Sequence, residues 1–526
     1  MRIEILDSTL RDGVQGEGIS FSVEDKLQIT EELDQLGISY IEAGNPGSNP
    51  KDLEFFRRAS FLSLKHAKLV AFGSTRRKGI AVEKDANVQA LLASGTDTVC
   101  IFGKCWSLHV DEILHTTKQE NLSMIRDTVS FLSSHGKRVF FDGEHFFDGY
   151  KENPAYALDA LRAAAEAGAA ALILCDTNGG CFPDEISEIT KTVCLQFPYK
   201  QIGIHTHNDG GMAVANAVAG AMAGAVHVQG TYLGYGERCG NANLSAVIAN
   251  LQIKKGMSCI PDECLSKMTR TARSIAEISN VTMAHSMPYV GSSAFAHKAG
   301  MHADGVLKLP RSFEHVDPKL VGNERRFLMS EIAGRKAVVE KIQKIRPTLT
   351  KDSPEIRAVV EALKQMEAQG YQFEGAESSF ELLVRKKTGD YHPFFELINY
   401  QIVSGRPAEP NCSATATIKI RVGEHTQLMA AEGNGPVNAL DKALRAALEV
   451  FYPQLRNVRL IDYKVRVLDS KDATAAMVRV LITSADGSNI WTTVGVSGDV
   501  LEASWTALVD SIEYALLHGQ DCSVPQ

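Results

Sequence analysis

The chain has 526 residues and a mass of 57.2 kDa, which predicts about two to four domains. Hydrophobic residues make up 44% and charged residues 22%, as in ordinary globular proteins. The formal net charge of −8 and a pI near 6.0 argue against a general nucleic-acid-binding protein, which needs a basic face. An anionic substrate in a local basic pocket stays possible.

Targeting signals and disulfides are not evident. The first residues lead straight into a strand-like run, so we expect no secretory leader, and no uncharged apolar run of about 18 residues predicts a transmembrane helix. The 10 cysteines lack the paired spacing of a structural zinc site and indicate free thiols. We therefore expect a cytoplasmic protein that binds neither membrane nor nucleic acid.

Short β-branched runs alternate with longer amphipathic stretches through the first half of the chain. The predicted strands are 3–7, 38–43, 68–72, 98–102, 138–141, 171–175, 201–205 and 226–229. Helical patterns lie between them, for example at 23–36, 121–134 and 155–167, and Gly37 and Gly168 follow two of these as helix-ending glycines. Eight strand–helix units in roughly 250 residues favour an α/β fold of the (β/α)8 TIM-barrel type over a doubly wound sheet.

The pattern changes after about residue 275. We place a catalytic barrel at 1–275, helical linker subdomains that contribute to the active site at 276–400, and a C-terminal regulatory or dimerisation domain at 401–526. The linker includes a predicted helix at 354–369 that begins after Ser353. Strands are predicted at 414–422, 458–467 and 475–483.

The C-terminal region repeats itself. Glycine-rich turns at 433–437 and 495–500 each follow strand-like sequence and open a helix, the first to about residue 450 and the second to about 517. This predicts a duplicated α+β domain. The duplication either serves stability alone or forms a regulatory module whose turns hold a small carboxylate ligand.

Polar residues follow several predicted barrel strands, where the site of a barrel enzyme forms. His205 and His207 stand two apart at a strand end, so both imidazoles face the same side. With Asp12 from the loop after the first strand they form a ligand set for a catalytic Mg²⁺, Mn²⁺ or Zn²⁺ ion. Arg11 beside Asp12 is placed to stabilise negative charge on a carbonyl or enolate oxygen, or else forms a structural pair with Asp12.

Two further stretches bear on phosphate binding. Gly234–Gly240 follows the last strand in the order Gly-X-Gly-X-X-X-Gly, so it fits a phosphate or CoA contact better than a nicotinamide dinucleotide. Arg76-Arg77-Lys78 follows the third strand and either meets nucleotide phosphates or forms a solvated loop.

Four of these stretches resemble the acyl-CoA-condensing barrel family that contains isopropylmalate, homocitrate and citramalate synthases. They are 7–13 (Asp-Ser-Thr-Leu-Arg-Asp-Gly), 205–209 (His-Thr-His-Asn-Asp), 236–241 (Gly-Glu-Arg-Cys-Gly-Asn) and 297–305 (His-Lys-Ala-Gly-Met-His-Ala-Asp-Gly). The duplicated C-terminal region is similar to the amino-acid-sensing domain of isopropylmalate and citramalate synthases.

The resemblance implies a role for each matching residue. Asp12, His205 and His207 would bind the metal, with Asn241 close to it. Arg11 would polarise the 2-oxo group of the substrate.

Other residues would bind the substrates and move protons. Thr177 would hold the carboxylate of the 2-oxo acid, Gly236 would contact a substrate, and Glu144 would belong to the base system that takes a methyl proton from acetyl-CoA. His302 and Asp304 would assist from a segment that family members contribute across a dimer interface.

Two stretches, 13–22 and 144–150, are similar to the citramalate synthases within this family. This implies condensation of acetyl-CoA with pyruvate, feedback by isoleucine and a homodimer. Asp142 stands where some citramalate synthases place an aromatic residue of the pyruvate pocket, so a bulkier acceptor, as in 2-isopropylmalate synthase, stays open. The implied condensation needs no cysteine nucleophile, so Cys175 and Cys239 are expected to be packing residues.

Two other classes of protein fit the residues less well. A biotin-dependent carboxyltransferase has a similar barrel, but the chain has no Ala-Met-Lys-Met segment. A non-catalytic amino-acid sensor would not need the set of Arg11, Asp12, Glu144, His205 and His207.

Overall fold

The computed structural model describes residues 1–297, 300–327, 335–350, 352–405, 413–468, 476–487 and 489–519. The chain divides into two compact units. One consists of Met1–Ala296 with Leu309–Arg326, and the other of His297–Lys308 with Phe327–Gln526.

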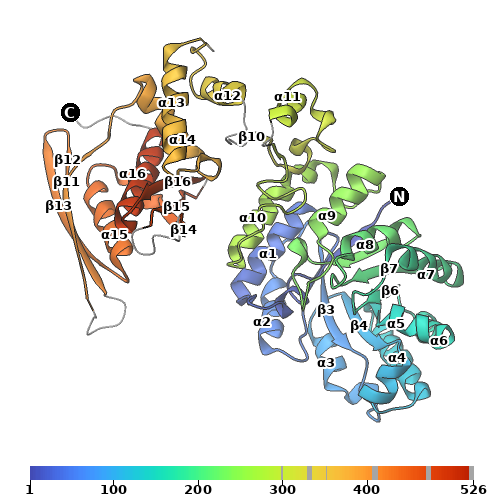
Figure 1. Cartoon of the computed structure of the whole chain (residues 1–526). Coiled ribbons are helices and arrows are strands. Elements are labelled where there is room, and N and C mark those ends of the chain that lie inside the picture. The colour runs from blue at the N-terminus through green and yellow to red at the C-terminus, as the bar shows by residue number, and fades with distance from the viewer. Residues whose placement is uncertain are drawn as a thin grey trace. The chain divides into compact units, whose positions relative to one another are not determined.

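The first unit is built on a closed barrel of parallel strands that neighbour one another in sequence order (Figure 1). Its strands are β1 (Glu4–Asp7), β2 (Tyr40–Gly44), β3 (Lys68–Ser74), β4 (Thr98–Lys104), β5 (Arg138–Glu144), β6 (Ala171–Asp176), β7 (Gln201–Thr206) and β8 (His227–Gly230). β1 pairs with both β2 and β8, which closes the barrel. The predicted TIM barrel is confirmed, and every predicted strand is present with ends that shift by only a few residues.

Helices surround the barrel. They are α1 (Val23–Leu36), α2 (Pro50–Ala59), α3 (Ala86–Ala93), α4 (Lys118–Ser134), α5 (Phe146–Glu152), α6 (Pro154–Glu166), α7 (Pro183–Gln196), α8 (Ala213–Met222), α9 (Leu244–Ala249) and α10 (Met268–Ile278). α1 shows how the sequence sets their ends: Ser22 and Asp25 form a capping box at its start, and Gly37 takes the left-handed conformation at its end. Ile29, Leu33 and Leu36 form its buried stripe.

The barrel interior holds an apolar cluster of Leu6, Tyr40, Val70, Cys100, Phe140, Ala171, Ile173 and Cys175. His227, which is completely buried near the start of β8, contacts the rings of Tyr40 and Phe140 in this cluster. A second, larger core lies between the strands and the outer helices. Because side chains alternate along a strand, the same strands supply both cores and still present polar groups at their carboxyl ends.

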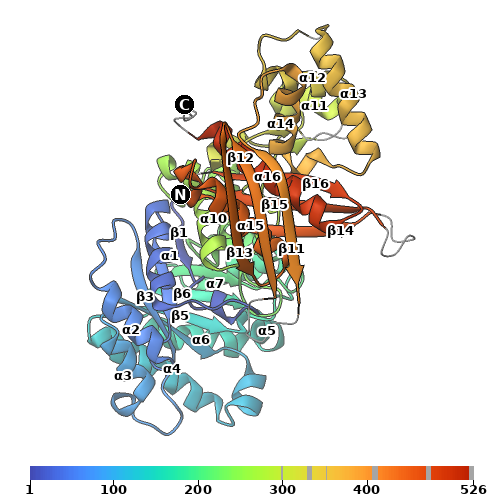
Figure 2. The same ribbon diagram turned by 90° about the vertical axis from the view of Figure 1, so that its left-hand side faces the viewer.

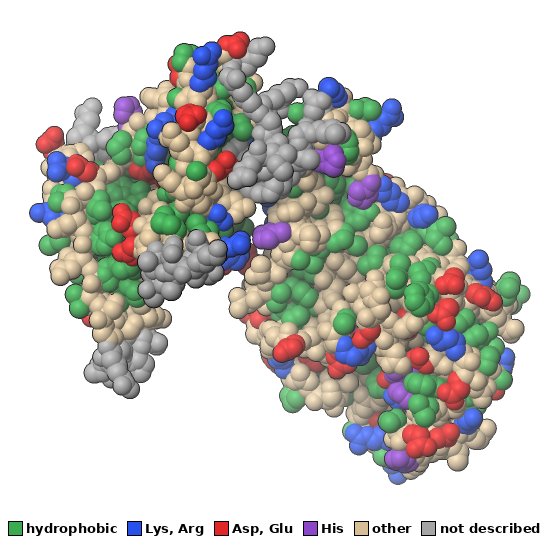
Figure 3. Space-filling view, viewed as in Figure 1, with side chains coloured by type: hydrophobic (Ala, Val, Ile, Leu, Met, Phe, Trp, Pro, Cys, Tyr) green, Lys and Arg blue, Asp and Glu red, His purple; other side chains and the backbone are tan. Residues whose placement is uncertain are grey.

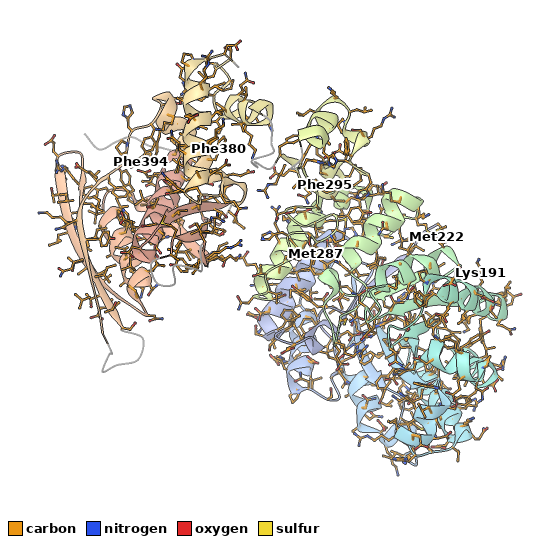
Figure 4. The ribbon with its side chains drawn as sticks, in the orientation of Figure 1. Lys191, Met222, Met287, Phe295, Phe380 and Phe394 are labelled. Atoms are coloured by element: carbon orange, nitrogen blue, oxygen red, sulfur yellow. The ribbon has the colours of Figure 1, made fainter. Side chains whose placement is uncertain are left out.

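The chain after α10 continues against the barrel. Phe295 is buried in the core of the first unit and Met287 packs against that core (Figure 4). β9 (Ala296–His297) pairs with β10 (Arg326–Phe327), and α11 (Gly300–Lys308) belongs to the second unit.

The second unit begins with a helical layer and continues as two similar halves. The helices are α12 (Arg335–Ile345), α13 (Pro354–Ala368) and α14 (Glu377–Thr388). The first half has strands β11 (Glu396–Ser404), β12 (Ala414–Val422) and β13 (His425–Gly433) followed by α15 (Pro436–Leu448). The second has β14 (Arg459–Val467), β15 (Val478–Ala485) and β16 (Ile490–Ser497) followed by α16 (Val500–His518). Figure 2 shows the two antiparallel sheets, and the predicted duplication is present.

One of these strands was missed from the sequence. β11 was not predicted, because most of its side chains are solvent-exposed and its apolar alternation is weak. β13 and β16 were recognised only as strand-like sequence before the two glycine-rich turns, without bounds. β11 begins at Glu396, so the predicted boundary at residue 400 falls inside a strand. The predicted strand 475–483 is observed from Val478, and Ala475 lies outside the described residues.

Each half of the second unit buries one helix on its sheet. α15 packs on β12 and β13, where Leu440 and Leu444 share a core with Ile418. α16 packs on β15 and β16 with Leu508 and Ile512 buried. Phe380 of α14 (Figure 4) lies in a further core that α13 and α14 form with Val494 of β16.

Charges of both signs are interspersed with apolar side chains over the face of the first unit seen in Figure 3. Across the part of the chain that the structure describes, every helix is too short or too polar to span a membrane.

The buried ion pair between Lys26 of α1 and Asp52 of α2 ties two outer helices together. Lys26 Nζ lies 2.6 Å from Asp52 Oδ1 and also donates to the carbonyl of Ala43, and both charged residues are buried. We predict that Asp52→Ala lowers the free energy of unfolding by about 3–5 kcal/mol, because it leaves the Lys26 charge buried without its partner.

The control is Glu54→Ala on the same helix, which removes a solvent-exposed ion pair with Arg57 and should leave the free energy of unfolding nearly unchanged. Urea unfolding followed by far-UV circular dichroism measures both. Equal effects of the two variants would show that the buried pair does not stabilise the barrel.

Candidate active site

The loop after β1 is fixed by its own hydrogen bonds. The N–H groups of Asp12 and Gly13 donate to the carbonyl of Ser8, at 2.8 and 3.0 Å. The carboxylate of Asp7 accepts from the N–H groups of Thr9 and Tyr232, so this loop is tied to the chain after β8. Asp12 is thereby held at the carboxyl end of the barrel.

Asp12, His205 and His207 meet at this end and are all buried. His205 Nε2 lies 3.3 Å from Asp12 Oδ2 and 3.3 Å from His207 Nε2. One ligand atom from each of the three lies within 4.8 Å of the others, and no other such group of His, Cys, Asp or Glu residues occurs among the described residues. The three residues that the sequence suggested as ligands are therefore brought together by the fold.

The charges of the three groups are strongly coupled. Burial alone would raise the pKa of Asp12, but Arg11, His205 and His207 outweigh it and hold that pKa well below its usual range. Burial would lower the pKa of His205, but its hydrogen bond to Asp12 raises it to about 9. Burial and the neighbouring His205 lower the pKa of His207 to about 3. The pocket therefore favours a single positive charge between the carboxylate and the imidazoles.

Arg11 is fixed on three sides. Its guanidinium donates to Glu42 Oε2 at 2.6 Å, lies 3.3 Å from Asp12 Oδ2 and stacks 3.7 Å from the centre of the Phe72 ring. Ser8 Oγ also donates to Glu42 Oε2. The arginine is thus oriented before any substrate binds, beside the carboxylate of Asp12.

Asn241 stands next to the histidines. A backbone bridge joins it to His207, its side-chain nitrogen donates to the carbonyl of Tyr235, and its Oδ1 is buried with no hydrogen-bond partner among the described residues. Gly236 has a φ of +151°, and a Cβ there would lie 2.2 Å from the Asn241 side chain. Only glycine therefore lets this loop bring Asn241 to its position.

Glu144 and Thr177 lie at the ends of β5 and β6. Glu144 forms an ion pair with Lys104 at the end of β4. The hydroxyl of Thr177 accepts from the N–H of His145, which adopts a left-handed conformation with φ of 54°. The turn after β5 is thereby tied to the end of β6 through the hydroxyl of Thr177.

The remaining predicted residues lie elsewhere or have other partners. His302 lies in α11, which belongs to the second unit, and the side chain of Asp304 is outside the described residues. Arg76 is buried in ion pairs with Glu120 and Asp127, so this member of the basic cluster is already neutralised.

Two side chains near the site differ from what the sequence suggested. Asp142, at the position of a pocket-forming aromatic residue in some citramalate synthases, is 4% exposed and accepts a hydrogen bond from Gln229 inside the barrel. The prediction that Cys239 is a packing residue like Cys175 was wrong: Cys239 is exposed because the loop after β8 turns it outward, whereas Cys175 is buried.

Two polar residues of the site, Lys104 and Gln229, were not assigned from the sequence, and Glu42 was placed only at the end of the second predicted strand, without a role. Lys104 ends β4 beside Glu144, and Gln229 lies inside the barrel in β8. Every second residue of a barrel strand points into the barrel. A polar residue at such an inward position, near the carboxyl end of a strand whose other inward residues are apolar, is the pattern that identifies these residues.

The donor set suits a divalent cation. Two imidazoles and a carboxylate fit a catalytic site, and the unpartnered Oδ1 of Asn241 beside His207 offers a further oxygen. The set contains no thiolate, and Mg²⁺, Mn²⁺ and Zn²⁺ can each bind to carboxylate and imidazole ligands.

Known proteins match the whole chain. Residues 2–281 match the HMGL-like family, 289–371 the homocitrate synthase post-HMGL domain-like family and 374–516 the LeuA allosteric (dimerisation) domain. The chain is 49% identical over 524 residues to the (R)-citramalate synthase of Aquifex aeolicus, with 99% of each chain covered. It is 51% identical over 523 residues to that of Synechocystis sp., with 97% of this chain and 96% of the relative covered. A probable 2-isopropylmalate synthase of Methanopyrus kandleri is 29% identical over 516 residues, with 97% and 98% covered.

The two cysteines near the site differ in accessibility. We predict that iodoacetamide alkylates Cys239 in the native protein and leaves Cys175 unmodified, because burial raises the pKa of the Cys175 thiol and excludes the reagent. Peptide mapping by mass spectrometry measures both sites, with the urea-unfolded protein as the control in which both react. Native labelling of Cys175 at the rate of Cys239 would contradict the structure.

Proposed function

The chain belongs to the (R)-citramalate synthases of the HMGL-like family, and on that premise we propose that it condenses acetyl-CoA with pyruvate and hydrolyses the thioester to give citramalate and CoA. The observation that carries the proposal is the buried group of Asp12, His205 and His207 beside a fixed Arg11. Such a group can hold and polarise a 2-oxo acid.

A divalent ion would be held by Asp12, His205 and His207, with Asn241 close by. When bound, it supplies Lewis acidity toward the 2-oxo group of the substrate. Arg11 donates to the same oxygen and stabilises the negative charge that develops there, while Glu42 and Phe72 keep the guanidinium in place. Thr177 binds the carboxylate of pyruvate through its hydroxyl.

Glu144 belongs to the base system that takes a proton from the methyl group of acetyl-CoA, which is a weak carbon acid. Lys104 positions this carboxylate at the rim. The methyl carbon then bonds to C2 of pyruvate, and the carbonyl oxygen takes up a proton to become the tertiary hydroxyl. Water finally cleaves the thioester and releases a carboxylate and the CoA thiol.

Three other features complete the proposed active site. Gly236 lies in the loop after β8, and we propose that this loop contacts the CoA part of acetyl-CoA. His302 and Asp304 assist from α11, which belongs to the second unit. No cysteine acts as a nucleophile in this scheme, because the enolate carbon forms the new bond directly.

The acceptor is proposed as pyruvate rather than the bulkier 2-oxoisovalerate of 2-isopropylmalate synthases. The support is the 49% and 51% identity to full-length (R)-citramalate synthases, against 29% to a probable 2-isopropylmalate synthase.

We propose that the C-terminal module regulates this activity and joins two chains in a homodimer. The match of residues 374–516 to an allosteric (dimerisation) domain supports both. Because citramalate leads to isoleucine, we propose isoleucine as the feedback inhibitor and the cytoplasm as the location. The two turns differ: α16 is capped by Asp499, whereas α15 begins after Gly435 without a side-chain cap.

The proposed reaction releases a thiol that can be measured directly. With Mn²⁺ and acetyl-CoA, we predict thiol release with pyruvate, and far less with 2-oxoisovalerate, 2-oxoglutarate or glyoxylate. EDTA should abolish it. Preference for 2-oxoisovalerate would identify a 2-isopropylmalate synthase, and no release with any acceptor would refute the condensation.

The metal ligands are tested by replacing one imidazole. His207→Ala should lower turnover by more than about 1000-fold, because losing the ion removes several kcal/mol of charge stabilisation. His135→Ala, which removes an exposed histidine at the end of α4, is the control and should leave turnover unchanged. Near-normal turnover of the His207 variant with Mn²⁺ present would refute the metal assignment.

The regulatory proposal is tested by adding amino acids to the full-length enzyme. L-isoleucine should lower turnover, whereas L-leucine and L-threonine should have little effect. Hydrogen exchange should slow on addition of isoleucine in peptides that cover 433–437 and 495–500, because a bound carboxylate occupies their N–H groups. Inhibition without protection at either turn would place the effector elsewhere.

A further inference from the structure

A hydrogen-bonded chain runs from the candidate metal site into the barrel. His205 Nδ1 lies 2.8 Å from Gln229 Oε1, and Gln229 Nε2 lies 3.1 Å from Asp142 Oδ1. The three residues come from β7, β8 and β5, and all are buried, Gln229 completely. These two hydrogen bonds connect the Nδ1 atom of His205, a candidate metal ligand, to the carboxyl group of Asp142 on β5.

The direction of each hydrogen bond follows from the groups involved. The amide nitrogen of Gln229 donates to Asp142 Oδ1 and also faces the sulfur of Cys100, so both acceptors lie on the nitrogen side of the amide. The amide oxygen of Gln229 therefore faces His205, and because an amide oxygen only accepts, His205 Nδ1 carries a hydrogen. The Nε2 atom, which points at Asp12 and His207, is then the nitrogen available to a cation.

Packing alone does not account for these two polar side chains. Apolar side chains of the barrel interior, among them Val70, Phe140 and Ile173, are completely buried in the same cluster. Burying an amide and a carboxyl there is unfavourable unless their hydrogen bonds are made, and an aliphatic residue would fill the space without that cost. The pair instead meets its hydrogen-bonding needs through a ligand of the candidate metal site.

We propose that Gln229, oriented by Asp142, is a positioning residue that fixes the tautomer and ring orientation of His205 for the divalent cation. The inference rests on the metal site proposed above and adds two residues to it. A histidine ligand whose second nitrogen lacks a fixed acceptor can change tautomer and rotate, which weakens metal binding by about 10- to 100-fold.

The test measures Mn²⁺ affinity of the full-length protein by isothermal titration calorimetry, without substrates. Gln229→Leu should weaken Mn²⁺ binding by about 10- to 100-fold. Ile173→Val, a packing change in the same interior, is the matched control and should leave the affinity unchanged. Thermal unfolding of each variant shows whether the barrel is intact.

A reciprocal exchange separates positioning from packing. Gln229→Glu alone places a carboxylate against Asp142 and should bind Mn²⁺ poorly. Combined with Asp142→Asn it should recover most of the affinity, because the amide that replaces the Asp142 carboxyl can donate to the new carboxylate while that carboxylate accepts from His205. This comparison stands even if Gln229→Leu does not fold.

The outcomes distinguish the two proposals. If His207→Ala loses Mn²⁺ binding while Gln229→Leu binds like the wild type, or if the double variant binds no better than Gln229→Glu, the positioning role is refuted and the metal site remains. If His207→Ala itself binds Mn²⁺ like the wild type, the metal site is wrong and the positioning role falls with it.

Discussion

Closure of the barrel between β1 and β8 is the constraint on which the site depends. Parallel pairing of Glu4–Asp7 with His227–Gly230 places the beginning of the chain beside residues more than two hundred positions later. The loop that carries Arg11 and Asp12 follows β1 directly, and the loop that carries Asn241 follows β8. Because all strands run in the same direction, their carboxyl ends share one rim, and β7 adds His205 and His207 to it.

The second feature of this rim is that its buried charged side chains are paired with one another. Glu42 neutralises Arg11, Asp12 faces two imidazoles, and Lys104 pairs with Glu144. Each charge is expensive to bury alone, so the partners must be fixed together by the strands that carry them. The result is a set of oriented groups that need little rearrangement when substrates bind, which is how a preorganised site stabilises developing charge.

The second unit is built from two similar halves, whereas the first unit is built on one closed barrel. Each half makes one antiparallel sheet of three strands and covers one face of that sheet with a helix. Strands such as β11 keep much of their surface exposed. An arrangement of this kind suits a module that binds partners on its surfaces, in contrast to the barrel, whose chemistry is confined to one rim.

The sequence by itself determined the barrel, the ends of several helices and the grouping of Asp12, His205 and His207, because these depend on local periodicity and on short motifs. Helix α1 and its glycine end follow from the pattern around Ser22 and Gly37, and His205 and His207 share a face because side chains alternate along a strand. The strand β11 escaped prediction because an exposed edge strand has a weak apolar pattern, and β13 and β16 were recognised only as strand-like sequence without bounds. Only the tertiary structure decided that Asp142 turns inward to Gln229, that Glu42 holds Arg11 and that Lys104 meets Glu144. These partners come from different strands, and the register of a closed barrel, which no local pattern encodes, sets which side chains meet.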